Sequence, residues 1–402
     1  MTVASSSLRY DVKVMGLIGV AHGLSHFFQL VLPAVFIPLK AEFGLSFFQL
    51  GILTAILYGT SGISQAAAGF LVDRVGGRPV LVTGMALCGI GTMMFAFAPS
   101  YEALIPMAVV AGLGNSVFHP SDLSLLTNKL DPSRLGRGYA IHAFCGNLGW
   151  AVPFPLLGAL AAIYDWRTAL FVAGLMGLVF AAFLILWSAE LDEDMSAGGK
   201  ADHEGGIMAD AKILFSPSVV LCFFYFALLA MSLIGIENFG VPGMIAFYDI
   251  QQSTATAALT GFLVAAAAGV LLGGFAADRT DRHDRVAMSG MFLAGAFMAA
   301  IASGAITPFM VLGCMALSGF WLGMTMPSRD MIVRKVTPPG KAGRVFGFVY
   351  SALDMGSASV PLILGLVLDL GNPQLVFFAI AVIMILTIPT VMQVQQTRPV
   401  EA

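Results

Sequence analysis

Long apolar runs recur along the whole chain, and each is close to the length that an α-helix needs to cross a bilayer. A helix spans the hydrocarbon core with roughly 20 residues, and most charged residues fall between these runs. The chain is 58% hydrophobic and only 11% charged, whereas about a quarter of the residues in a soluble domain are charged. We therefore predict an all-α membrane protein with twelve transmembrane helices. They are expected near residues 13–39, 47–71, 79–98, 103–128, 138–163, 167–188, 214–241, 255–276, 286–304, 307–333, 343–368 and 373–393.

One long polar segment, residues 190–213, divides the predicted helices into two sets of six. Its charged and small residues are typical of a flexible linker, so we expect a cytoplasmic linker between an N-terminal bundle (1–189) and a C-terminal bundle (214–402).

Lys and Arg residues gather in alternate loops, and cytoplasmic loops retain positive charge. Only Lys40 and Arg167 fall in the opposite set of loops. This asymmetry predicts a multi-pass protein of the bacterial inner membrane with both termini in the cytoplasm.

The two halves of the sequence repeat each other. The segment GFLVDR at 69–74 recurs as GFAADR at 274–279, and Pro120-Ser121 recurs as Pro327-Ser328. Parallel repeats of six helices are an architecture in which substrate binds near the midplane, between the halves, and access alternates by a rocking motion. The repeat therefore predicts two pseudo-symmetric six-helix bundles.

The loop after the second predicted helix resembles a family signature. Residues 69–81, GFLVDRVGGRPVL, are similar to the sequence G-x-L-A-D-R-x-G-R-K-x-x-L of the major facilitator superfamily, with departures at Val72, Gly77 and Arg78. The resemblance implies the major facilitator fold and a gating role for this loop. We expect Gly69 to allow close helix approach, and Asp73 to accept from a helix N-terminus or to pair with Arg residues. The gating residues implied are Gly69, Asp73, Arg74, Gly76, Arg78, Asp278 and Arg279.

A narrower resemblance is carried by GLGNSVFHP at 112–120, by GNLG at 146–149 and by His26. These residues are similar to the fosmidomycin-resistance branch of the same superfamily. The sequence departs from that branch at Ser121-Asp122, where Pro-Glu is expected. The branch implies a proton-coupled antiporter that mediates efflux of small, often anionic or drug-like molecules.

Polar side chains inside the predicted membrane helices are candidate site residues, because an ionisable group at bilayer depth costs at least a few kcal/mol. His22, His26 and Gln29 share one helix face, as do Asn115, His119 and Asp122. In the fold that the chain resembles, helices 1, 4, 7 and 10 line the central cavity. The candidate substrate-binding residues are His22, His26, Gln29, Asn115, His119, Asp122, His142, Asn238 and Arg329.

Glu237 is the first candidate for proton coupling, followed by Asp330 and Asp354, because an apolar site favours exchange of a proton on a carboxylate. Each of these polar groups also has a structural interpretation. Glu237 can bond to a helix end, and a histidine can make a packing hydrogen bond, which is the interpretation we favour for His22 and His142. Arg329 can bind an anionic substrate or bridge to Asp122.

Two other functions compete with export of an organic solute. His22, His26, His119 and His142 are four of the six histidines, and imidazole suits transition metals, so the cargo can instead be a transition metal or a metal chelate. A membrane enzyme or sensor is the third candidate, but no catalytic constellation is evident. We therefore expect no enzyme, no cofactor and no resident metal. The net charge of −3 argues against nucleic acid, and we expect a monomer whose partners are substrate, protons and lipid.

Overall fold

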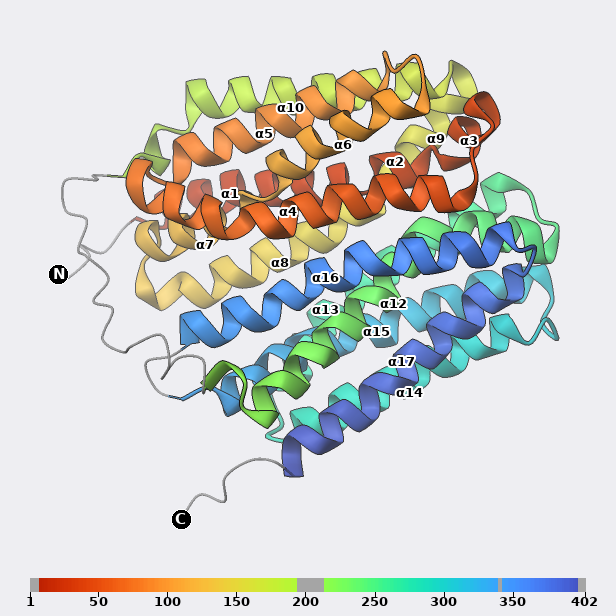
Figure 1. Cartoon of the computed structure of the whole chain (residues 1–402). Coiled ribbons are helices and arrows are strands. Elements are labelled where there is room, and N and C mark those ends of the chain that lie inside the picture. The colour runs from red at the N-terminus through yellow and green to blue at the C-terminus, as the bar shows by residue number, and fades with distance from the viewer. Residues whose placement is uncertain (1–6, 194–212, 339–341, 397–402) are drawn as a thin grey trace. The chain divides into compact units, whose positions relative to one another are not determined.

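The computed structural model describes residues 7–193, 213–338 and 342–396, and all regular structure in these ranges is helical (Figure 1). The chain divides into two compact units. Unit 1 contains Met1–Leu45 and Ile52–Lys200, and unit 2 contains Ser46–Gly51 and Ala201–Ala402. Residues 194–212, most of the predicted linker, lie outside the described residues.

The described residues of unit 1 form ten helices and two short 3₁₀ turns, with the first residues of α4 grouped in unit 2. They are α1 (Leu8–Gln29), α2 (Val31–Ala34), α3 (Phe36–Phe43), α4 (Phe47–Val75), α5 (Gly77–Phe95), α6 (Tyr101–Asn115), α7 (Phe118–Lys129), η1 (Pro132–Arg134), α8 (Leu135–Ala151), α9 (Pro153–Ile163), α10 (Trp166–Trp187) and η2 (Ala189–Leu191). In unit 2 the helices are α12 (Pro217–Tyr248), α13 (Gln252–Asp278), α14 (His283–Ala302), α15 (Pro308–Val336), α16 (Ala342–Asp369) and α17 (Pro373–Gln396).

Eleven helical segments in the described residues are long and apolar enough to cross a membrane. The helix pairs α6/α7 and α8/α9 each make one of these segments. The first predicted span, near 13–39, corresponds to α1, α2 and α3 together. The prediction of a twelve-helix all-α membrane fold is confirmed in this form, with the first span interrupted rather than continuous.

Prolines explain why the first span is interrupted. The helix breaks at Leu30 and again at Val35, each three residues before a proline, Pro33 or Pro38. A proline has no N–H to donate and its ring clashes with the preceding turn. A third break, between α8 and α9, comes directly before Pro153.

The same helix pairs pack together in both units, as the sequence repeat predicts. In unit 1, α1 packs on α8 and α5 packs on α6 and α10. In unit 2, α12 packs on α16, and α14 packs on α15 and α17. These helices occupy equivalent places in the two sets of six. The pairing therefore confirms two related bundles.

Helix ends follow local chemistry. Gly44 ends α3 with φ 64°, a left-handed conformation that a residue without Cβ adopts readily. Asp165 caps α10 by accepting a hydrogen bond from the Thr168 backbone N–H at 2.6 Å. That bond to the charged form lowers the pKa of Asp165.

Candidate functional site

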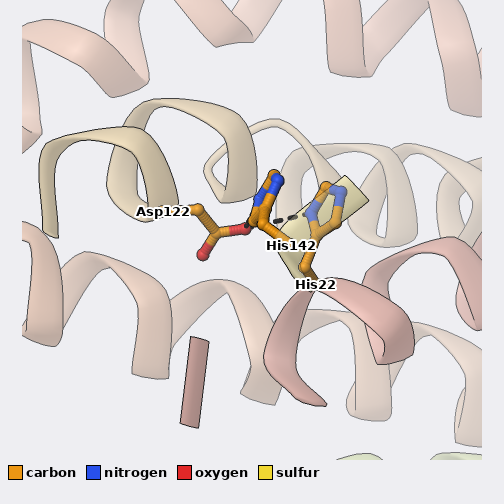
Figure 2. Close-up of side chains that lie close together, drawn as sticks. All are labelled: His22, Asp122 and His142. Atoms are coloured by element: carbon orange, nitrogen blue, oxygen red, sulfur yellow. Dashed lines mark hydrogen bonds and ion pairs between the residues drawn. The ribbon is translucent and has the colours of Figure 1, made fainter. Parts of the chain in front are cut away.

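A buried carboxylate and two imidazoles meet inside unit 1. Asp122 comes from α7, His22 from α1 and His142 from α8 (Figure 2). Asp122 Oδ2 lies 3.0 Å from His22 Nδ1 and 3.1 Å from His142 Nε2. The two imidazole rings stack, with centroids 3.5 Å apart. We call these three residues the His–Asp cluster.

The His–Asp cluster is sealed from solvent. The Asp122 side chain is 0% exposed, and the imidazoles of His22 and His142 are 3% and 8% exposed. His142 Nε2 shares a hydrogen bond with Asp122, but His22 Nδ1 and Asp122 Oδ1 have no hydrogen-bond partner among the described residues. Polar atoms buried without partners cost free energy. The cluster is therefore strongly polar and incompletely paired.

A second group of polar residues continues from the cluster through neighbouring rings. The ring centroid of His22 lies 4.4 Å from that of His26 and 5.3 Å from that of His119. His26 in turn stacks on Trp150, with centroids 4.1 Å apart. Trp150 was not among the predicted site residues, although it directly follows the GNLG motif.

Gln29 and Asn115 complete this group by hydrogen bonding. Trp150 Nε1 donates to Gln29 Oε1 at 2.9 Å, and Gln29 Nε2 donates to Asn115 Oδ1 at 3.1 Å. Asn115 Nδ2 donates to the Ser25 carbonyl at 3.3 Å. Unit 1 thus brings together every candidate binding residue predicted in its sequence: His22, His26, Gln29, Asn115, His119, Asp122 and His142.

In unit 2, Arg329 lies in an aromatic setting. Its guanidinium carbon is 4.6 Å from the ring centroid of Phe226 on α12 and 5.6 Å from that of Tyr350 on α16. Arg329 Nε donates to Asp330 Oδ1 at 2.9 Å, and the Tyr350 hydroxyl donates to the same oxygen at 2.9 Å. The Arg329 side chain is 12% exposed and that of Asp330 is 39% exposed. Phe226 and Tyr350 were not predicted from the sequence.

The remaining predicted residues of unit 2 lie on two helices. Glu237 and Asn238 are each 1% exposed on α12. Asn238 Nδ2 donates to the carbonyl of Ile234, one turn back, at 3.0 Å, whereas neither carboxylate oxygen of Glu237 has a hydrogen-bond partner among the described residues. Asp354 is half-buried on α16. These residues and Arg329 belong to unit 2, so a single binding site shared with the candidate residues of unit 1 stays a prediction.

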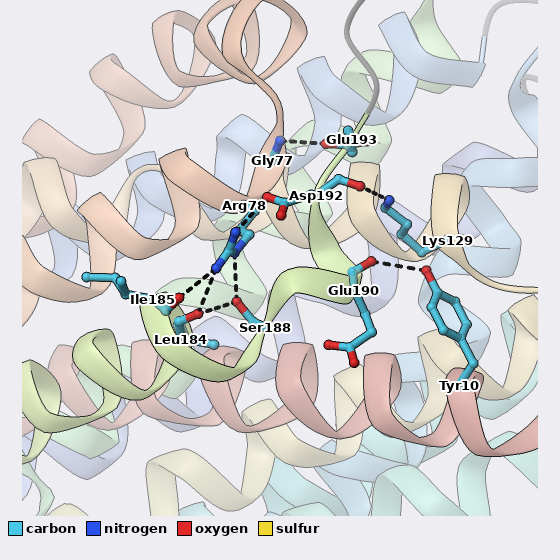
Figure 3. Close-up of polar contacts among 10 residues, drawn as sticks. All are labelled: Tyr10, Gly77, Arg78, Lys129, Leu184, Ile185, Ser188, Glu190, Asp192 and Glu193. Atoms are coloured by element: carbon cyan, nitrogen blue, oxygen red, sulfur yellow. Dashed lines mark hydrogen bonds and ion pairs between the residues drawn. The ribbon is translucent and has the colours of Figure 1, made fainter.

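The predicted gating loop is tied to the segment that follows α10 (Figure 3). Arg78 donates from Nε to Ser188 Oγ at 2.9 Å, from Nη1 to Asp192 Oδ1 at 2.7 Å, and from Nη2 to the last carbonyls of α10. Glu193 Oε2 accepts from the Gly77 backbone N–H at 2.6 Å, at the start of α5. Gly76, the residue before α5, has φ 89° and no side chain with which to cap the helix. Glu193 therefore caps α5, which is one of the two roles that we expected of Asp73.

Other residues on the segment after α10 bind α1 and α7. The Glu190 carbonyl accepts from the Tyr10 hydroxyl at 3.0 Å, and the Glu190 carboxylate pairs with Lys13. Lys129 donates to the Asp192 carbonyl. The hydrogen bond from Lys13, with smaller contributions from the backbone and nearby cations, lowers the pKa of Glu190. We call residues 188–193 the strap, because they join the ends of α1, α5, α7 and α10.

The charged residues of the two repeated motifs are exposed. Asp73, Arg74, Asp278 and Arg279 are all exposed. No atom lies within 4 Å of where a Cβ on Gly69 would stand, so the described residues do not show the close helix approach that we expected there.

Comparisons with known proteins agree with this architecture. The family model described as Major Facilitator Superfamily matches residues 17–253 and 234–400. The fosmidomycin resistance protein of Escherichia coli (strain K12) is 25% identical over 384 residues, which cover 93% of this chain and 91% of that protein. The 3-(3-hydroxy-phenyl)propionate transporter of the same strain is 24% identical over 334 residues, covering 80% of this chain and 76% of that protein.

A solved structure shares the fold. The crystal structure of a bacterial homolog to the human lysosomal transporter Spinster, in an inward-facing and occupied conformation, has a TM-score of 0.75 to this chain. The match covers 99% of this chain and 100% of the chain in that structure, at 16% sequence identity. At that identity the likeness concerns the fold alone.

Proposed function

Because the chain belongs to the Major Facilitator Superfamily, we propose that it is a proton-coupled antiporter that exports a small anionic organic molecule by alternating access. Membership in the family makes it a multi-pass membrane transporter. The proton coupling, the anionic substrate and the direction of transport are our proposals. We further propose that it works as a monomer in the inner membrane, with both termini in the cytoplasm and without an enzymatic step.

The observation that carries proton coupling is the setting of Glu237. Its carboxyl group is 1% exposed and has no hydrogen-bond partner among the described residues. An unpaired ionised carboxylate in such a place would cost many kcal/mol, so this conformation accommodates the protonated form. A rearrangement that opens the group to water would release the proton. We therefore propose that Glu237 carries the proton, with Asp330 and Asp354 as the next candidates.

Arg329 supports an anionic substrate with an apolar body. A guanidinium is always charged and binds carboxylates and phosphonates through paired N–H donors. Here it lies beside the rings of Phe226 and Tyr350, which offer apolar surface next to the charge. One relative is named for a propionate that carries a hydroxyphenyl ring, a molecule with both features. We propose that this chain carries molecules of that class.

Export is supported by the similarity to the fosmidomycin resistance protein. Resistance to a compound is consistent with its removal from the cell. We propose that the inward proton gradient drives the substrate outward, with one site exposed alternately to the two sides.

Transport of a transition metal or a metal chelate is the second candidate. The convergence of His22, Asp122 and His142 in unit 1 favours it. The two candidates differ in the charge of the cargo. Binding of an anion would depend on Arg329, whereas binding of a metal cation would depend on the His–Asp cluster.

Reconstituted vesicles test the proposal and separate the candidates. The full chain is placed in liposomes that contain a pH-sensitive dye, and a panel of small carboxylates, phosphonates and divalent metal ions is offered in turn. We expect an anion of the panel to move protons in the opposite direction, and Arg329→Ala to abolish that movement. Liposomes without protein are the control. Proton movement with metal ions alone would favour the second candidate, and anion movement without protons would overturn the coupling.

A further inference from the structure

The donor atoms of the His–Asp cluster lie close together. His22, Asp122 and His142 each offer one ligand atom, and these three atoms all lie within 4.8 Å of one another. They come from three different helices, α1, α7 and α8 (Figure 2). The three positions are far apart along the chain, so it is the packing of the three helices that brings these side chains together.

The spacing of these atoms fits a small tetrahedral ion. Zinc binds imidazole nitrogen at about 2.0–2.1 Å and carboxylate oxygen at about 2.0–2.2 Å, which places neighbouring tetrahedral ligands roughly 3.3 Å apart. Asp122 Oδ2 lies 3.0 Å from the His22 nitrogen and 3.1 Å from the His142 nitrogen. To bind one ion, the side chains would have to shift by about 1 Å. The stacked rings of His22 and His142 would also have to turn so that both nitrogens face it.

The Nδ1 atom of His22 is not satisfied by Asp122. It lies 3.0 Å from the carboxylate oxygen, yet it makes no hydrogen bond among the described residues. Asp122 Oδ1 is likewise buried without a hydrogen bond. Two unsatisfied polar atoms at 0–3% exposure are a costly arrangement, and an added cation would relieve it.

The donor set selects the class of ion. Two imidazole nitrogens and one carboxylate oxygen suit zinc and its first-row neighbours, whereas calcium and magnesium prefer oxygen ligands alone. Three protein ligands leave a fourth position open for water or for a donor atom of a bound molecule. From this geometry we infer that His22, Asp122 and His142 form a binding site for a divalent first-row transition metal ion. The inference concerns binding and does not require that the ion crosses the membrane.

Metal binding to the purified protein tests the inference. The full chain in detergent, with any histidine tag removed, is titrated with Zn²⁺ by calorimetry. We expect one saturable site per chain, and we expect Asp122→Asn and His142→Gln to weaken binding on the order of 100-fold or more. His283→Gln is the matched control, because His283 is a buried histidine on α14 in the other unit, and it should leave affinity unchanged.

A spectroscopic measurement covers the case in which the cluster variants do not fold. Co²⁺ bound to the unmodified protein should give the intense visible absorption of a four-coordinate ion, and added Zn²⁺ should displace it. Absence of saturable Zn²⁺ binding, a weak six-coordinate cobalt spectrum, or full affinity in folded Asp122→Asn would each overturn the inference. In those cases the cluster would be a metal-free hydrogen-bonded group. Failure here would leave the proposed anion transport untouched, because that proposal rests on Glu237 and Arg329.

Discussion

Gly146 lies directly against the imidazole of His22. A Cβ atom at position 146 would stand 2.8 Å from His22 Nε2 and 2.9 Å from Cε1 of His26. These distances are too short for real contacts, so a methyl group would push both rings out of place. The glycine in α8 is therefore what lets α1 bring its two histidines into the polar group of unit 1.

Gly146→Ala should accordingly destabilise the protein by about 1–3 kcal/mol, measured as a lower unfolding temperature in detergent. Gly136→Ala is the matched control on the same helix, because nothing lies within 4 Å of its Cβ position. It should be neutral or slightly stabilising, since alanine favours helix over glycine by about 0.5–1 kcal/mol. Equal effects of the two variants would contradict the packing described here.

Arg78→Lys should also destabilise the protein, although the charge is kept. The guanidinium bonds Ser188, Asp192 and the end of α10 at once, and a lysine ammonium cannot reproduce that planar fork. We expect a loss of about 1–3 kcal/mol in chemical or thermal unfolding. Arg74→Lys, at an exposed position, should stay within about 0.5 kcal/mol of the original protein. An Arg78→Lys protein as stable as the Arg74→Lys protein would refute this role of the strap.

The contacts of the strap also predict that the stability of the protein depends on pH. Since the pKa of Glu190 is lowered in the fold by the hydrogen bond from Lys13, its stabilising contribution is fully present above the pKa of the unfolded chain. It is lost as the pH falls through the lower pKa of the folded protein. Between about pH 5.5 and about pH 3, the unfolding temperature of Glu190→Gln should therefore fall less than that of the original protein. If the unfolding temperature fell equally with pH in the two proteins, the pair between Glu190 and Lys13 would have no role in stability.

Asp73→Asn separates gating from binding. Asp73 is exposed at the end of α4, so the substitution should change the free energy of unfolding by no more than about 0.5 kcal/mol. We expect it to slow transport in vesicles while the equilibrium affinity for the anion stays nearly unchanged. A large loss of affinity would place Asp73 in the binding site instead.

The sequence predicted the fold well because every span carries its own apolar signal. The predicted range 373–393, for example, lies within α17 (Pro373–Gln396). Interruptions of the first span were missed, although Pro33 and Pro38 were visible in the sequence. A proline marks where a backbone hydrogen bond is lost, but whether the helix then bends or breaks depends on its neighbours.

Contacts between distant residues were harder to predict. Helical periodicity placed His22, His26 and Gln29 on one face of the first helix, and the structure groups them, but no periodicity indicated that Trp150 would cover His26. The region from residue 190 was interpreted as linker from its charge, yet Glu190 binds Tyr10 across 180 residues. Such pairings depend on how helices pack, which a single sequence does not encode locally.

Glu237→Gln tests the central claim, proton coupling, most directly. Glutamine keeps the size and neutrality of the protonated carboxyl group but cannot release a proton. With the transported anion on both sides of the vesicle membrane, the variant should still exchange labelled for unlabelled anion, because that exchange needs no net proton transfer. When the anion is offered on one side only, the variant should move no protons and should not accumulate anion against its gradient. If Glu237→Gln still moves protons with the anion at the ratio of the original protein, the proton carrier is not Glu237 and the proposed coupling is wrong.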